Sequence, residues 1–322
     1  MNVDIIMPIY NPNKWIFQAI ESVFNQTYKS FNIYIIDDCS PVPSEILSKI
    51  IQMSSNEKKI TYKRLELNKR AANARNIGAS LSSGDIIAFL DQDDFWHPDK
   101  LLESIEYLKV NPEIGMVHSN ISGVNSLGEI DKDIFLEENE FRNQKPYKLM
   151  DTIEVSKDIF STYSVRLGTM VVQRKAFDKI GGFDAKLFGG EDLDFAVRLA
   201  SKFRVGHFPK SLSFRRFHTS SVSKSFKRKR NIGRLNAIVK LHSKFPHLSS
   251  VSSNKFKIQL QDTIKMDLGS GKNKSALKLS YLLFKIEPKE FKTFSFLFLS
   301  LLNINGLFFF NFYRKFKESL EI

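Results

Sequence analysis

The chain has 322 residues, 42% hydrophobic and 26% charged, which predicts one large domain or two ordinary domains with a substantial core and excludes disorder throughout. With 15 Gly, 10 Pro and a single cysteine, Cys39, a collagen-like chain and an intramolecular disulfide are excluded, and a reducing compartment is favoured. The formal net charge is +13, from 48 Lys and Arg against 35 Asp and Glu.

Strand and helix patterns alternate over the first hundred residues. Short apolar segments predict strands at 3–7, 31–36, 60–65 and 86–90. Apolar residues at helical spacing predict helices at 15–24, 46–51, 71–81 and 98–108. This alternation is typical of an α/β fold, in which helices cover a mostly parallel sheet.

Polar clusters follow three of the predicted strands. They are Tyr10-Asn11, Asp37-Asp38 and the acidic segment 91–94. Open α/β sheets bind ligands in the crevice beyond the carboxyl ends of their strands. The coincidence of the three clusters with strand ends is therefore the first indication of a functional site.

The second hundred residues are less regular. Residues 120–165 are polar, 167–172 form a strand candidate, and 180–184 predict a turn. A helix is expected from Glu191, whose carboxylate and its acidic neighbours suit the positive end of the helix dipole. Composition changes to Lys, Arg and Ser after Ser220, so a domain boundary is expected near residue 223.

Asp91, Asp93 and Asp94 are three carboxylates within four residues, which repel one another unless a cation or solvent screens them. Mg²⁺ and Mn²⁺ prefer oxygen ligands and often also engage substrate phosphates. The alternative is a solvated acidic turn before the next helix. The position at a strand end favours the metal.

The other candidates each have a structural alternative. Asp37-Asp38 can accept hydrogen bonds from a ligand or cap a helix, and Arg75 can bind phosphate or a base or lie on an exposed helix. The Glu191-Asp192 pair can supply a general base or complement a helix dipole. His218 can complete a metal site or pack against its aromatic neighbours.

Seven short motifs occur in order over residues 3–223, about two thirds of the chain. They are VDIIMPIYN (3–11), SVFNQTY (22–28), IYIIDDCS (33–40), NKRAANARNIG (68–78), GDIIAFLDQDD (84–94), IGGFD (180–184) and EDLDFAVR (191–198). Together they resemble the inverting nucleotide-sugar glycosyltransferases of family two, which have the GT-A fold. Cys39 stands where that family usually has glycine.

The resemblance implies a role for each matching residue. Binding of the donor nucleotide would fall to Pro8, Tyr10, Asp38, Arg75 and Asp91. Asp93 and His218 would bind Mn²⁺ or Mg²⁺, with Asp94 in support. Asp192 would be the catalytic base that deprotonates an acceptor hydroxyl, beside Glu191. The implied domain division is a GT-A catalytic domain at 1–223 and a basic, mainly helical region at 224–322.

The charge is unevenly distributed, because residues 201–322 hold 25 Lys and Arg but only 6 Asp and Glu. Such a basic region predicts an anionic partner. Residues 293–313 carry no formal charge and are rich in Phe and Leu. Interfacial helices on an anionic membrane are expected for 293–313, with burial against protein or a membrane span as alternatives.

The predicted activity is transfer of a sugar to a hydroxyl of a glycan or lipid-linked saccharide in bacterial surface-polysaccharide synthesis. The resemblance implies a UDP-sugar as the donor. The N-terminus shows no secretory signal, so the expected location is cytoplasmic and peripheral on the inner face of the membrane. The alternatives are a nucleotidyltransferase and a non-enzymatic nucleotide- or nucleic-acid-binding protein. No nucleic-acid motif is found, so no nucleic-acid partner is expected; an oligomer is compatible with the sequence.

Overall fold

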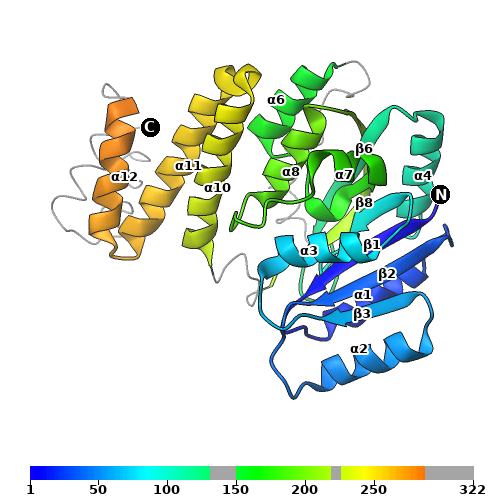
Figure 1. The fold of residues 1–322 in the computed structure, drawn as a ribbon. Coiled ribbons are helices and arrows are strands. Elements are labelled where there is room, and N and C mark those ends of the chain that lie inside the picture. Colours follow the sequence, from blue (N-terminus) through cyan, green and yellow to red (C-terminus); the bar gives the residue numbers. More distant parts are fainter. Residues whose placement is uncertain (131–149, 219–225, 287–322) are drawn as a thin grey trace. The chain divides into compact units, whose positions relative to one another are not determined.

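The computed structural model describes residues 1–130, 150–218 and 226–286, and the chain divides into two compact units. The first unit comprises Met1–Lys186 and Glu191–Ser221, and the second Leu187–Gly190 and Val222–Ile322. The strands of the first unit are β1 (Val3–Ile9), β2 (Phe31–Asp37), β3 (Ile60–Arg64), β4 (Ile86–Phe89), β5 (Phe95–Trp96), β6 (Ile114–Val124), β7 (Met170–Gln173) and β8 (Arg204–Arg216). Its α-helices are α1 (Trp15–Phe24), α2 (Glu45–Asn56), α3 (Arg70–Leu81), α4 (Lys100–Val110), α6 (Thr152–Thr162), α7 (Arg174–Ile180) and α8 (Glu191–Ala200) (Figure 1).

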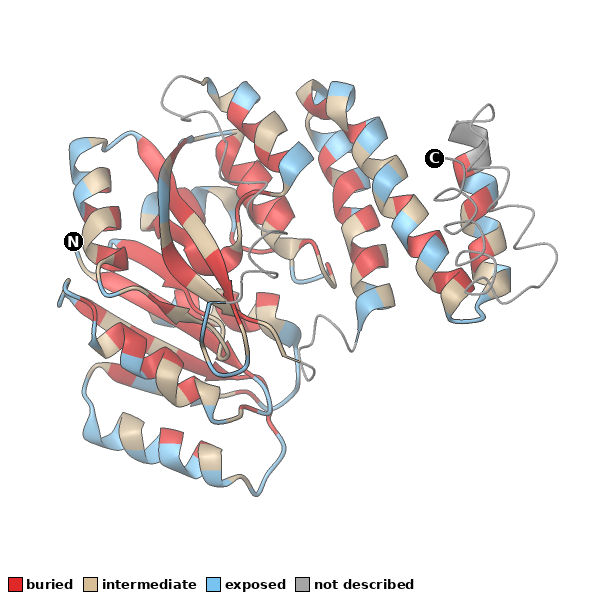
Figure 2. Ribbon diagram, turned by 180° about the vertical axis from the view of Figure 1, so that it is seen from behind, coloured by how far each residue is buried: buried red, intermediate tan, exposed pale blue. Residues whose placement is uncertain are grey.

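The described strands form an eight-stranded mixed sheet with the order β3-β2-β1-β4-β7-β6-β8-β5. Strands β3, β2, β1 and β4 are parallel, β7 runs antiparallel to both β4 and β6, and β8 is parallel to β6. Every residue of β1, β4 and β7 is buried, which is typical of strands covered on both faces (Figure 2). The predicted α/β class is confirmed.

The strand pairing brings distant parts of the chain to one edge of the sheet. The carboxyl ends of β1, β2 and β4 share this edge because the strands are parallel. The pairing of β7 with β4 and β6 places Gly168, just before β7, and Val124, at the end of β6, on the same side. Val124 pairs with Arg216, so the end of β8 joins them. We call this the carboxyl edge.

Local sequence explains the helices that support this edge. In α1, Ile16, Ala19, Ile20 and Val23 repeat at helical spacing and are buried. Helix α3 packs so closely on β1 that a Cβ at Gly78 would lie 2.5 Å from the Cγ2 of Ile6. Glycine at position 78 therefore lets helix and strand approach each other.

The predicted strands and helices of the first hundred residues are confirmed to within a few residues. The predicted strand at 167–172 is confirmed from Met170, where β7 begins, whereas Leu167–Thr169 form a short 3₁₀ helix. No helix or strand was predicted within 120–165, although β6 ends in this segment and α6 lies within it. Helix α6 begins with a capping box in which Asp151 accepts from the Glu154 N–H.

The second unit contains the helices α10 (Lys227–Lys244), α11 (Ser249–Gly269) and α12 (Asn273–Ile286), as expected for a helical region. Leu235, Leu260, Ile264 and Leu268 belong to its core, and the buried Asp267 accepts two hydrogen bonds from Arg228, at 2.6 and 3.2 Å. None of the helices in the described part of the chain has the length and apolar character needed to span a membrane. The predicted interfacial segment 293–313 lies outside the described residues.

Candidate active site

The acidic loop that follows β4 lies at the carboxyl edge and is tied to the end of β1. The side chain of Gln92 accepts from the Tyr10 N–H at 2.9 Å and donates to the Tyr10 carbonyl at 3.2 Å. Within the loop, the Asp94 N–H donates to the carbonyl of Asp91 at 3.2 Å. The amide of Gln92 thus holds the loop in place, while its three aspartates remain for other contacts.

The structure brings Asp93 and His218 together, although 125 positions separate them in the sequence. Nε2 of His218 lies 2.9 Å from Oδ2 of Asp93. The imidazole packs on Trp15, with ring centroids 4.4 Å apart. A carboxylate oxygen and an imidazole nitrogen are therefore adjacent at the carboxyl edge. The structure shows the packing considered for His218, and its role as a metal ligand stays a prediction.

This pair suits a divalent cation that takes its remaining ligands from substrate phosphates and water. No group of three His, Cys, Asp or Glu side chains that could hold a metal ion occurs among the residues that the structure describes. Asp93 and His218 would hold the cation together with a bound diphosphate.

Arg216 was not predicted as a site residue, but it contacts the acidic loop through both its side chain and its backbone. Its Nε donates to the Asp93 carbonyl at 3.1 Å, its backbone N–H donates to Oδ1 of Asp94 at 3.0 Å, and Nη2 donates to Gln18 at 2.5 Å. The guanidinium lies over the rings of Trp15 and Phe95, at 5.3 and 5.5 Å from their centroids. Arg215 precedes it in the sequence, and no sequence pattern indicated which of the two arginines would contact the acidic loop.

Asp94 differs from its neighbours in its electrostatic environment. Burial, and then the negative charges of Asp93 and Asp91, raise the pKa of Asp94 well above its usual range. A carboxyl group in this setting takes up a proton more readily than its neighbours. Asp94 is therefore suited to stabilise the loop, in which it accepts a hydrogen bond from the Arg216 N–H.

Arg75 connects the acidic loop to helix α8. Its Nη2 donates to Oδ1 of Asp91 at 2.7 Å, and its Nη1 lies 3.7 Å from Oε1 of Glu191. Although burial opposes its charge, Asp91 and Glu191 raise the pKa of the Arg75 guanidinium. Only 4% of Arg75 is exposed, so this arginine lies behind the carboxylates and joins the two acidic groups into one site.

Asp192 lies in the first turn of α8. Its Oδ1 accepts from the hydroxyl of Tyr163 at 2.5 Å and from the Leu193 N–H at 3.0 Å. Farther along the helix, Asp194 is buried and bonded to Arg198 at 2.7 Å, which in turn donates to the carbonyls of the turn at 180–182. Asp192 therefore lies at the candidate site, whereas Asp194 stabilises the fold. Nothing in the polar sequence around Tyr163 indicated its contact with Asp192.

Asp37 and Asp38, at the end of β2, are both buried and are occupied by groups of the protein. Asp37 accepts from Ser40, from the Tyr62 hydroxyl at 2.8 Å and from Arg64 at 2.9 Å. Asp38 accepts from the N–H groups of residues 69 and 70, at 2.6 and 2.7 Å. Burial raises the pKa of Asp38 despite these hydrogen bonds. Its carboxylate therefore shapes the loop that precedes α3.

The remaining predicted donor residues lie at the end of β1. Pro8 is buried within the strand, whereas Tyr10 is 46% exposed. Asn11 follows with a positive φ of 45°, and its N–H donates to the hydroxyl oxygen of Ser40 at 2.9 Å. Tyr10 is thus the member of the pair whose side chain can meet a ligand directly.

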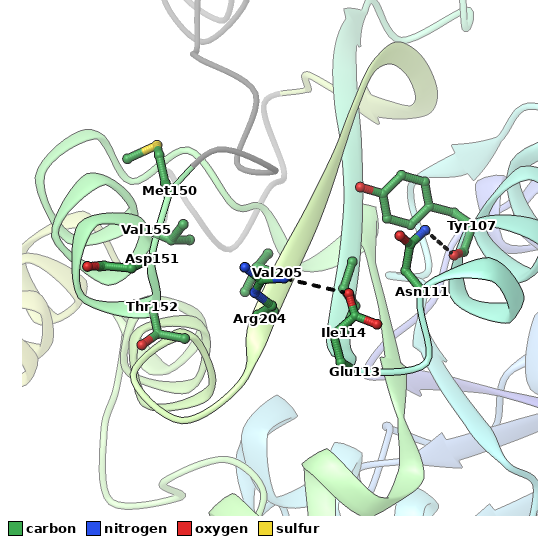
Figure 3. A pocket seen from close by; sticks show the side chains of 10 residues that line it. All are labelled: Tyr107, Asn111, Glu113, Ile114, Met150, Asp151, Thr152, Val155, Arg204 and Val205. Carbon is green, nitrogen blue, oxygen red and sulfur yellow. Dashed lines mark hydrogen bonds and ion pairs between the residues drawn. The ribbon is translucent and has the colours of Figure 1, made fainter.

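A separate cavity of about 140 Å³ lies elsewhere in the first unit (Figure 3). Ile114 and Arg204, the first residues of β6 and β8, line it, so it lies at the opposite end of these strands from the carboxyl edge. Its charged groups include Glu113, which pairs with Arg204 at 3.8 Å, and Asp151, which caps α6. The predicted site residues do not line this cavity.

Comparison with known sequences identifies relatives over this unit. The family model described as "Glycosyl transferase family 2" matches residues 4–180. An "Uncharacterized glycosyltransferase" of Rickettsia felis is 29% identical over 211 residues, which cover 66% of this chain and 32% of that protein. The "Amylovoran biosynthesis glycosyltransferase AmsB" of Erwinia amylovora is 24% identical over 62% of this chain and 64% of its own length. The match therefore spans only about a third of the Rickettsia relative.

Solved structures show the same fold. TarS 1–349 of S. aureus in complex with UDP-GlcNAc has a TM-score of 0.64 at 16% identity, and the match covers 91% of this chain and 89% of that TarS 1–349 chain. The mannosyltransferase PcManGT of Pyrobaculum calidifontis, in complex with GDP-Man and Mn²⁺, has a TM-score of 0.61 at 16% identity, covering 95% of this chain and 86% of that chain. The GT-A fold expected from the sequence motifs is confirmed.

Proposed function

Because the chain belongs to glycosyl transferase family 2, we propose that it is an inverting, metal-dependent glycosyltransferase that uses a nucleotide-sugar, by preference a UDP-sugar. The observation that carries the proposal is the bridge made by Arg75, which contacts Asp91 at 2.7 Å and lies 3.7 Å from Glu191. This bridge supports a single site that includes the acidic loop and the start of α8, where Asp192 follows Glu191. The UDP-GlcNAc bound to TarS supports the donor class.

On the donor side, Pro8 and Tyr10 would border the nucleotide, Asp38 would shape the adjoining loop, and Arg75 would orient Asp91. Asp93 and His218 would hold Mn²⁺ or Mg²⁺, for which the Mn²⁺ of PcManGT is the supporting precedent. When bound, a divalent cation neutralises charge that develops on the leaving diphosphate.

Asp192 would accept the proton of the acceptor hydroxyl while that oxygen attacks the anomeric carbon. The bond between the anomeric carbon and the diphosphate oxygen breaks as the new glycosidic bond forms, and the nucleoside diphosphate leaves with the bonding electrons. A single displacement inverts the stereocentre and requires no nucleophile from the protein. General base catalysis of this kind typically contributes about 10²–10⁴-fold to the rate.

For the acceptor, we propose a hydroxyl of a glycan or lipid-linked saccharide in bacterial surface-polysaccharide synthesis, by analogy with the amylovoran enzyme. The second unit supports a peripheral position on the cytoplasmic face of the membrane. Its described residues, 226–286, contain 14 Lys and Arg but only two acids, and one of these, Asp267, is buried and paired with Arg228. Such a surface attracts anionic lipid headgroups.

The test is a screen of nucleotide-sugars with the purified protein, divalent cation and saccharide acceptors, followed by product analysis. Release of a nucleoside diphosphate supports the proposal, whereas release of pyrophosphate from NTP and a sugar phosphate would indicate a nucleotidyltransferase. In the same assay, Asp192→Asn should lower transfer by about 10²–10⁴-fold with nucleotide affinity nearly intact. Comparable turnover by the variant would remove Asp192 from the role of base.

A further inference from the structure

Tyr163 contacts Asp192 but is not among the residues proposed to bind the donor. Its hydroxyl donates to Oδ1 of Asp192 at 2.5 Å, and the Leu193 N–H donates to the same oxygen at 3.0 Å. Within the described part of the chain, Oδ2 of Asp192 accepts no hydrogen bond. The two oxygens of this carboxylate are therefore not equivalent.

The local fold fixes the phenol of Tyr163 in position. Tyr163 terminates α6 in the left-handed conformation, with φ 56° and ψ 38°, and its N–H donates to the Ile159 carbonyl at 2.9 Å. At the other end of the helix, the capping box of Asp151 and Glu154 fixes the first turn. The guanidinium of Arg166 lies 4.7 Å from the centre of the Tyr163 ring.

A tyrosine in the left-handed region carries a conformational cost, since L-residues other than Gly, Asn and Asp rarely adopt this conformation. Gly, Asn or Asp at this position would end the helix at a smaller conformational cost, but none of them carries a hydroxyl group that could reach α8. Strained backbone of this kind is often found at functional sites. The contact with Asp192 accounts for a tyrosine at this helix end.

We propose that Tyr163 is a positioning residue for the reaction: its hydroxyl, together with the Leu193 N–H, holds Oδ1 of Asp192 so that Oδ2 faces the acceptor hydroxyl. This inference rests on the proposed function, in which Asp192 is the base. A general base must lie within hydrogen-bond reach of the proton that it removes, so a carboxylate free to rotate would spend less time in the productive orientation. Tyr163 itself neither gives nor takes a proton.

The test is Tyr163→Phe, which removes the hydroxyl and keeps the ring that packs near Arg166. The expected result is a kcat lower by about 10- to 100-fold, the rate equivalent of one hydrogen bond to a charged group, with the donor KM and the nucleotide affinity within about twofold of wild type. The control is Tyr28→Phe, because the Tyr28 hydroxyl donates to a backbone carbonyl, that of Met1, before the start of β1 and away from the carboxyl edge. The control should keep the kcat of the wild type.

The outcomes distinguish the inference from the proposed function. If the wild type transfers sugar and Asp192→Asn does not, while Tyr163→Phe has the wild-type kcat, the positioning role is overturned and the proposed function stands. A rise in donor KM at unchanged kcat would also overturn it. The double variant Tyr163→Phe with Asp192→Asn should be no slower than Asp192→Asn alone, because the hydroxyl acts only through that carboxylate; a further loss would contradict the inference. No transfer by the wild type with any donor would instead count against the proposed function.

Discussion

Two acidic clusters lie at the carboxyl edge, and they use their carboxylates differently. Asp37 and Asp38, after β2, are buried and accept hydrogen bonds from side chains and backbone N–H groups of the protein itself. Asp91 and Asp93, after β4, have side chains that are 38% and 27% exposed and pair with Arg75 and His218. Similar acidic sequences at similar strand ends therefore serve the fold in one case and remain accessible to a ligand in the other.

The difference arises from what surrounds each cluster. The end of β2 faces Tyr62 and Arg64 on β3 and the loop before α3, which together satisfy both carboxylates. After β4, three carboxylates lie close together, and Arg216 donates one hydrogen bond to the Asp93 carbonyl and one to Oδ1 of Asp94. Buried carboxylates with several donors stabilise a loop, whereas clustered, partly exposed carboxylates are suited to bind a cation.

The largest effect should come from the exposed cluster. Asp93→Ala is expected to lower transfer by at least about 10²-fold and to abolish the dependence of donor binding on Mn²⁺ or Mg²⁺, because the carboxylate ligand is lost. The free energy of unfolding should change by less than about 1 kcal/mol, since removal of one of three neighbouring acids also relieves repulsion. Calorimetry of donor binding with and without cation measures the first effect, and urea unfolding measures the second.

A suitable control is Asp85→Ala, which removes an exposed carboxylate just before the start of β4, at the other end of the strand. This variant should bind donor with the cation dependence of the wild type. If Asp93→Ala also kept that dependence, the cation would have to bind elsewhere.

The sequence predicted much of the parallel half of the sheet, because its strands are continuous apolar segments. It did not predict β6 and β8, whose buried positions include His118, Ser119, Ser122 and Ser213. These polar side chains are compatible with burial because the fold supplies partners, such as the Gly168 carbonyl that accepts from Ser213 at 3.0 Å. Such partners come from distant residues and leave no local pattern.

The candidate site was predictable to a similar degree. Short motifs indicated the carboxylates, and the resemblance implied the pairing of Asp93 with His218 at a common cation, for which their 2.9 Å contact is compatible geometry. The supporting residues Arg216 and Tyr163 were not predicted, because their roles depend on the packing of β8 and α6 against residues far away in the sequence. The roles of the predicted site residues remain predictions.

The buried cluster should respond in the opposite way. Asp37→Asn is expected to lower the free energy of unfolding by about 2 kcal/mol, because Arg64 and Tyr62 lose their charged acceptor. Burial, and then the Asp37 carboxylate, raise the pKa of Tyr62 to about 12. The same variant should therefore lower the pKa of this phenol. Urea unfolding and ultraviolet titration of tyrosine test the two effects. A loss of transfer with unchanged stability would show that Asp37 belongs to the site.

Lys100 extends the comparison to a buried basic side chain. Its Nζ donates to the Thr169 carbonyl at 2.9 Å, and burial lowers the pKa of Lys100 to about 7. Between pH 7 and about 10, the unfolded chain binds a proton that the folded chain has released, so stability should rise with pH by up to about 1.4 kcal/mol per unit. Unfolding free energies of the wild type and Lys100→Met across this range should diverge accordingly. Parallel curves would contradict the shift.

The smallest effect is expected in the turn after Asp38. Cys39 has a φ of 63°, which favours glycine and gives a physical reason for the glycine usual at this position in the family. Cys39→Gly should raise the free energy of unfolding by about 0.5 kcal/mol, as relief of strain outweighs the greater backbone entropy of glycine in the unfolded chain. Cys39→Ala keeps the strain and should give no such gain; an equal gain in both variants would assign the effect to the thiol.

The most direct measurement is a crystal structure of the protein with a bound nucleotide-sugar and Mn²⁺. We expect the diphosphate and the cation at Asp93 and His218, with the anomeric carbon open to attack from the side of Asp192. A diphosphate bound away from these residues, or an anomeric carbon out of reach of any hydroxyl that contacts Asp192, would contradict this expectation.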